Sequence, residues 1–151
     1  MDGLLLGVDY LRDTALGNTP EIGKQVAVVG GGDTAVDCAR TALRQGAEVT
    51  LLYRRTRREM PAEDYEIDAA EKEGVRFRFL ENPVEMRGNG RLEELVIEHM
   101  ELGEPDASGR CRPLATGTTY AKSFDTVIAA ISSRRPMSPV SEMRMRSTRS
   151  A

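Results

Sequence analysis

A glycine-rich turn near the start of the chain has the residue types and spacing most suited to chemistry. Gly30, Gly32 and Ala35 form the pattern Gly-x-Gly-x-x-Ala, directly after the apolar run Gln25–Val29. In a turn of this kind the first glycine permits a tight bend and the second lets the backbone approach a pyrophosphate. The third small residue allows close packing of helix on strand. The pattern therefore predicts a dinucleotide-binding turn.

The segment after the turn has helical periodicity, and a helix is predicted over residues 34–45. Its first turn would offer unpaired N–H groups and a partial positive charge to phosphates. Asp33 or Thr34 is expected to cap this helix. A turn that serves packing alone is the alternative. The predicted cofactor contacts in the turn are Gly30, Gly31, Gly32, Asp33, Thr34 and Ala35.

The end of the next predicted strand indicates which dinucleotide would bind. NAD sites usually carry Asp or Glu there, about 20 residues beyond the glycines. This chain has Arg54 and Arg55, 19 and 20 positions after Ala35. A carboxylate would repel the 2′-phosphate of NADP, whereas a guanidinium binds it through paired hydrogen bonds. Two such bonds at about 1.5–3 kcal/mol each favour NADPH over NADH on the order of a hundredfold.

The alternative for these arginines is a solvated basic turn, because Arg57 and Arg58 follow closely. Four guanidinium groups in five positions cannot all bind one phosphate. Arg54 and Arg55 are the predicted contacts to the 2′-phosphate.

The elements around the turn have the size of one βαβ unit. A buried strand over 25–29, the helix 34–45 closed by Gly46, and a strand over 48–53 occupy about 30 residues. A second helix over 63–73, closed by Gly74, leads to a third parallel strand over 75–80. This order predicts a parallel sheet with right-handed crossovers.

The pattern changes after residue 80. Two antiparallel strands are predicted around a turn at 88–90, followed by a glycine-rich loop, one more short strand and a final buried parallel strand. The fold class is therefore α/β, a Rossmann-like three-layer domain with a parallel sheet, a β-meander crossover and a final parallel strand. The last four strands are predicted over 83–87, 92–102, 110–114 and 126–131.

Three segments make up the expected domain organisation. Residues 1–22 form a leading helix, over 3–16, and a linker, and residues 23–131 form the NADPH-binding domain. Residues 132–151 form a basic tail, which has five arginines and a single acidic residue, Glu142. The tail is expected to be disordered, and it has no aromatic residues that would favour nucleic acid.

The overall composition excludes several classes of protein. With 40% hydrophobic and 30% charged residues, the chain is typical of a soluble globular domain. No apolar run approaches the ~18 residues that span a bilayer, so no membrane partner is expected. Cys38 and Cys111 lie too far apart in sequence for a redox pair or a metal site, which indicates reduced thiols and a cytoplasmic location. His99 is the only histidine, and no catalytic residue and no metal ligand are predicted.

Several motifs, taken in order, resemble the NADPH-binding domain of the glutamate synthase small-subunit (beta) family, which consists of FAD-dependent pyridine nucleotide oxidoreductases. The similarity covers roughly residues 3–131. The motifs are VAVVGGGDTAVD (26–37), YRRT (53–56), EMPA (59–62), ENP (81–83), LGEPD (102–106) and DTVI (125–128).

The resemblance implies that hydride passes from NADPH to FAD, and that electrons then move through iron–sulfur clusters to a partner subunit. FAD would belong to the full-length parent and is not expected to be held by this chain alone, because the family places a cluster domain and a first, FAD-binding glycine motif ahead of this segment. The expected partners are the FAD-binding and iron–sulfur parts of the parent protein or a large catalytic subunit. Whether the chain is itself an enzyme stays open. The alternative is a non-catalytic module, or a truncated fragment, that binds NADPH without turnover.

Overall fold

A parallel sheet forms the middle layer of the structure, which is a computed structural model describing residues 2–130 and 144–147. Its five strands lie in the order β1-β8-β2-β3-β4. All neighbouring strands in it are parallel, so their carboxyl ends meet at one edge. The strands are β1 (Leu4–Leu6), β2 (Gln25–Val29), β3 (Glu48–Tyr53), β4 (Arg76–Phe79) and β8 (Thr126–Ala129).

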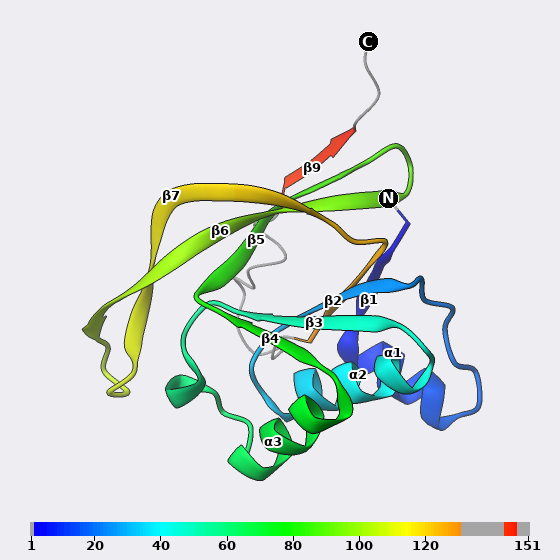
Figure 1. Ribbon diagram of the computed structural model, residues 1–151, viewed down its shortest axis with the longest axis horizontal. Coiled ribbons are helices and arrows are strands. Elements are labelled where there is room, and N and C mark those ends of the chain that lie inside the picture. Colours follow the sequence, from blue (N-terminus) through cyan, green and yellow to red (C-terminus); the bar gives the residue numbers. More distant parts are fainter. Residues whose placement is uncertain (1, 131–143, 148–151) are drawn as a thin grey trace.

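The two faces of this sheet are covered differently (Figure 1). Three helices cover one face, and a second sheet in the order β7-β6-β5-β9 covers the other. The helices are α1 (Gly7–Ala15), α2 (Asp33–Arg44) and α3 (Asp64–Glu73), with a short 3₁₀ helix η1 (Arg57–Glu59) before α3. The strands of the second sheet are β5 (Glu81–Gly88), β6 (Leu92–Pro105), β7 (Cys111–Ser123) and β9 (Arg144–Ser147).

Two hydrophobic cores hold the three layers together. Side chains alternate across a strand, so Val28 of β2 packs in the core beneath the helices while Ala27 packs in the core beneath the second sheet. Both residues are fully buried. Because both faces of β2 are covered, its sequence is continuously apolar rather than alternating. The predicted α/β fold with a β-meander and a final parallel strand is confirmed.

The start of the chain differs from the prediction of a helix over 3–16. Residues Leu4–Leu6 form β1, which pairs with β8 from Leu4 opposite Val127 to Leu6 opposite Ala129. The helix begins only at Gly7, where a Cβ would lie 3.0 Å from the Cα of Ala130. Pairing with β8 thus overrides the helical spacing of Leu4, Val8, Leu11 and Ala15 that predicted the longer helix, and the leading segment extends the sheet.

Strand β7 is much longer than the strand predicted over 110–114. It continues to Ser123 and pairs with β6, with a register shift between Glu98 and Met100. Its side chains are exposed or half-buried. The sequence of β7 therefore lacks the alternation of apolar and polar residues that would predict a strand.

The basic tail was expected to be disordered, and most of it lies outside the described residues. Its described part, residues 144–147, forms β9, which pairs in parallel with β5. The expectation is wrong for these four residues. Among the described residues, no helix is long and apolar enough to cross a membrane.

Candidate functional site

The glycine turn lies at the carboxyl edge of the parallel sheet, between β2 and α2. Gly30 has a φ of +141°, and a Cβ there would lie 2.4 Å from the carbonyl oxygen of Ala130. It would also lie 3.3 Å from the Cβ of Ala35, which is fully buried. Only glycine fits this position, and a small residue at 35 lets the helix approach the strand as the pattern predicts.

Gly31 packs against the end of the neighbouring strand. A Cβ at Gly31 would lie 2.4 Å from Cε1 of Tyr53, the last residue of β3. The carbonyl of Gly31 also accepts a hydrogen bond of 3.1 Å from the backbone N–H of Ala62. The turn is therefore fixed on two sides, by β3 and by the segment between η1 and α3.

Gly32, by contrast, faces open space. A Cβ there would have no neighbour within 4 Å. Gly32 is the N-cap of α2, and no side chain among the described residues caps this helix, so the predicted cap by Asp33 or Thr34 is wrong. The N–H groups of the first helical turn are consequently left without a capping side chain, which is the arrangement that binds phosphates.

Two carboxyl groups meet beside the start of α2. The pKa of Glu66 on α3 is raised, first by burial, then by a hydrogen bond and charge repulsion from Asp33, with Asp37 adding repulsion. Oε2 of Glu66 is buried and has no hydrogen-bond partner among the described residues. The raised pKa means that the pair favours one negative charge over two.

The structure gives the two arginines predicted to bind the 2′-phosphate different surroundings. Arg54 directly follows β3 and is half-buried. Arg55 is only 5% exposed: its Nε donates a hydrogen bond of 2.9 Å to the carbonyl of Cys111, and its guanidinium lies 3.9 Å from Asp106. Arg55 thus holds the tip of the β6–β7 hairpin, and phosphate contact by either arginine stays a prediction.

The other two arginines of the cluster, Arg57 and Arg58, also have different surroundings. Arg57 donates a hydrogen bond of 2.6 Å to Asp68 on the acidic face of α3. Arg58 is exposed and lines a cavity of about 580 Å³ between η1 and the hairpin tip. Arg57 is therefore bonded to α3.

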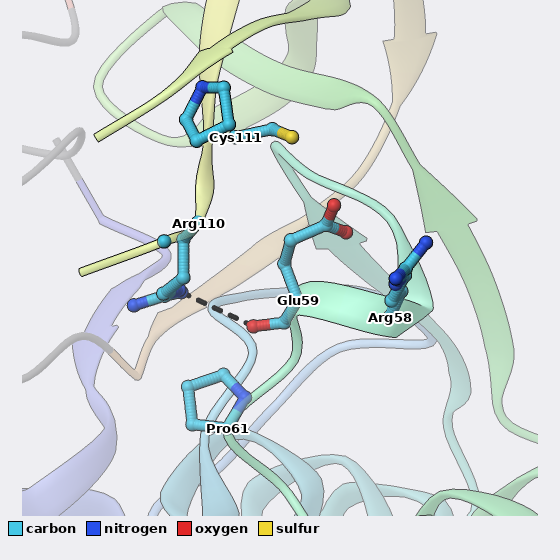
Figure 2. A pocket seen from close by; sticks show the side chains of 7 residues that line it. Arg58, Glu59, Pro61, Arg110 and Cys111 are labelled. Atoms are coloured by element: carbon cyan, nitrogen blue, oxygen red, sulfur yellow. Dashed lines mark hydrogen bonds between the residues drawn. The ribbon is translucent and has the colours of Figure 1, made fainter. Parts of the chain in front are cut away.

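The cavity also contains a residue that no sequence motif singled out. Arg110 donates from Nη2 to the hydroxyl of Tyr53 at 3.0 Å and to the carbonyl of Glu59 at 3.3 Å, as Figure 2 shows for the second bond. Its local sequence gives no sign of this role. Arg110 lies 57 positions beyond Tyr53, and only the fold of the hairpin brings the two residues together. The cavity is lined by Arg58, Glu59, Pro61, Pro105, Gly109, Arg110 and Cys111.

Sequence relatives agree with this architecture. The profile of the pyridine nucleotide-disulphide oxidoreductase family matches residues 1–135. The chain is 51% identical over 129 residues to the NADPH-Fe(3+) oxidoreductase subunit beta of Geobacter sulfurreducens, covering 83% of this chain and 19% of that protein. It is 45% identical over 116 residues to the glutamate synthase [NADPH] small chain of Escherichia coli, covering 74% of this chain and 25% of that protein. The resemblance that the motifs predicted is confirmed.

Solved structures share the fold. FprA of Mycobacterium tuberculosis in complex with NADPH matches with a TM-score of 0.59 and 20% identity, over 72% of this chain and 39% of FprA. Thioredoxin reductase of Lactococcus lactis matches with a TM-score of 0.60 and 23% identity, over 86% of this chain and 36% of that enzyme. The chain spans a fifth to a quarter of the curated relatives described above. On the family profile, the relatives and the fold together, the chain belongs to the pyridine nucleotide-disulphide oxidoreductase family.

Proposed function

We propose that this chain is the NADPH-binding domain of a flavin-dependent oxidoreductase and presents NADPH for hydride transfer to FAD. One observation carries the proposal. The start of α2 has no capping side chain among the described residues, and at its N-cap, Gly32, an added Cβ would have no neighbour within 4 Å. Such an open helix start suits a pyrophosphate. The names of two relatives, an NADPH-Fe(3+) oxidoreductase subunit and a glutamate synthase [NADPH] small chain, support NADPH as the nucleotide.

The proposal divides the nucleotide between two groups of residues. The turn and first helical residues Gly30, Gly31, Gly32, Asp33, Thr34 and Ala35 would hold the pyrophosphate through backbone N–H groups. Arg54 and Arg55 would hold the 2′-phosphate, with Arg55 also fixing the hairpin. The raised pKa of Glu66 beside Asp33 would lower the negative charge near the phosphates.

The electron acceptor in this proposal lies elsewhere in the parent protein. FAD accepts the hydride, and iron–sulfur parts or a large catalytic subunit pass the electrons on. Support comes from the name of the Geobacter relative, a subunit of an oxidoreductase. The second candidate, binding of NADPH without turnover, applies to the chain on its own, since the predicted contacts supply phosphate-binding groups and no redox centre.

A substitution at Gly32 tests the binding site without disturbing the fold. Gly32 has a φ of −90° and open space around its Cβ position, so Gly32→Val fits the folded chain. The valine would nevertheless stand where the pyrophosphate approaches. We expect NADPH affinity to fall at least tenfold in a calorimetric titration, with only a small fall in melting temperature, because Val is a poorer N-cap residue than Gly.

Gly46→Asn is the matched control, because Gly46 lies just beyond the other end of α2, also in open space, and Asn tolerates its positive φ. Unchanged NADPH affinity in Gly32→Val would contradict the proposed site. NADPH oxidation by the isolated chain with added FAD would favour turnover over binding alone.

A further inference from the structure

The hairpin tip is docked onto the carboxyl end of β3 by two arginines. Arg55 reaches outward from the end of β3 to Cys111 and Asp106 on the tip. Arg110 reaches back from the tip to Tyr53, the last residue of β3, and to Glu59. These reciprocal contacts make the tip, which belongs to the second sheet, one wall of the cavity beside the glycine turn.

Arg110 keeps unused hydrogen-bonding capacity in this cavity. A guanidinium has five N–H donors. Its Nη2 serves Tyr53 and Glu59, whereas its Nε is buried and has no acceptor among the described residues. A buried donor without a partner is unfavourable, so an acceptor that arrives with a ligand would satisfy it.

The charges around the cavity favour an anion. Arg58 and Arg110 both line it, and the only carboxylate among the lining residues belongs to Glu59. That carboxylate accepts from the backbone N–H and the hydroxyl of Thr56 in the capping box of η1. It is therefore bonded to its own turn, and it does not bond to either guanidinium among the described contacts.

Tyr53 connects this cavity to the nucleotide turn. One edge of its ring occupies the space that a Cβ on Gly31 would need, and its hydroxyl accepts from Arg110. Tyr53 therefore contacts both the glycine turn and Arg110, a residue that lines the cavity. The cavity is also lined by three uncharged residues, Pro61, Pro105 and Gly109.

We propose that Arg110 is a specificity-determining residue, which binds the 2′-phosphate of a 2′-phosphoadenosine group held in this cavity. The inference rests on the proposed function and adds a residue of the second sheet to the site. A guanidinium suits this role because it matches phosphate geometry with paired donors. Gln at the same position would keep a neutral donor and lose the charge.

Binding of two nucleotide fragments to the full chain tests this role. Adenosine 2′,5′-bisphosphate carries the 2′-phosphate, and AMP lacks it. We expect Arg110→Gln to weaken the bisphosphate about tenfold or more, as loss of one charged hydrogen bond predicts, and to leave AMP within twofold. Arg112→Gln, a change at an exposed arginine two positions along the same strand, should alter neither affinity.

Tyr53→Phe distinguishes direct binding of the phosphate by Arg110 from an effect of Arg110 on the position of Tyr53. It keeps the ring against Gly31 and removes the hydroxyl that Arg110 bonds. Under the proposal, Tyr53→Phe retains most of the preference for the bisphosphate. Equal loss of preference in Tyr53→Phe and Arg110→Gln, or equal loss of both fragments in Arg110→Gln, would overturn the inference. Unchanged preference in Arg110→Gln would overturn it as well.

Alkylation of Cys111 provides a readout that needs no substitution. Cys111 lines the cavity and Cys38 is fully buried elsewhere. Saturating bisphosphate should slow the reaction of Cys111 with iodoacetamide at least fivefold, and AMP at equal occupancy should slow it less. An unchanged rate would overturn the inference while leaving the proposed function intact. If the unmodified chain bound neither fragment, both proposals would fail together.

Discussion

Arg55 and Cys111 lie 56 positions apart in the sequence, and the Nε of Arg55 donates a hydrogen bond of 2.9 Å to the carbonyl of Cys111. The bond joins the end of β3 to the first residue of β7. It is made by a side chain that is 5% exposed, within reach of Asp106. The basic cluster after β3 therefore has a structural task as well as the proposed task of binding phosphate.

Substitution of Arg55 should consequently reduce stability. In Arg55→Met the carbonyl of Cys111 and the carboxylate of Asp106 lose this partner, and a hydrogen bond to a charged group contributes about 1.5–3 kcal/mol. We expect urea unfolding to show a loss of that size. Arg112→Met, at an exposed position, is the control and should change stability by less than about 0.5 kcal/mol. Equal stabilities of the two variants would show that Arg55 does not hold the hairpin.

The raised pKa of Glu66 predicts a dependence of stability on pH. Because the folded-state pKa lies above the unfolded value of about 4.3, the folded state holds the proton more tightly. The associated stability is present below the unfolded pKa and is lost as pH rises through the folded pKa. Glu66→Gln removes this titration, so the variant should gain stability over the unmodified chain between pH 4 and pH 8.

Thermal unfolding across this pH range measures the effect. Glu104→Gln, at an exposed position on the hairpin, is the control and should follow the unmodified chain. The difference in melting temperature between Glu66→Gln and the unmodified chain should widen as pH rises. A difference that stays constant or narrows would contradict the raised pKa of Glu66.

The two cysteines should differ sharply in reactivity. Burial, reinforced by the charge of Asp37, raises the pKa of Cys38 to about 12, and the thiolate is the reactive form. Cys111 is half-buried and lines the cavity. At pH 8, iodoacetamide should modify Cys111 in the native chain and Cys38 only after unfolding. Mass spectrometry of the modified peptides distinguishes them, and comparable native rates would refute the burial of Cys38.

The residues that sequence reasoning located are those whose role follows from local geometry. Gly30 needs a positive φ and Ala35 needs a small side chain, and both requirements are visible in the spacing of the turn. Strand β2 is apolar throughout because both of its faces are covered. Such local signals were sufficient for the βαβ unit and for the final parallel strand.

The parts that sequence reasoning missed depend on partners distant in sequence. Leu4 has helical spacing with Val8 and Leu11. Leu4–Leu6 nevertheless forms a strand because the edge of β8 is available. The second half of β7 pairs with β6 although its side chains are mostly exposed. Arg110 enters the site only because the hairpin folds back over β3, and Arg55 is committed to that same hairpin. The residue types and their local sequence do not indicate these long-range contacts.

We propose that this domain selects NADPH through guanidinium groups at the end of β3. Arg54→Gln tests this selection without disturbing the hairpin, whereas any substitution that includes Arg55 would also remove the bond from Arg55 to Cys111. Loss of one charged contact should reduce NADPH affinity about tenfold and leave NADH affinity unchanged.

The most direct measurement is a calorimetric titration of the unmodified chain with NADPH and with NADH under identical salt. We expect a preference for NADPH on the order of a hundredfold, as two charged hydrogen bonds to one phosphate would give. Equal dissociation constants for the two nucleotides would contradict it.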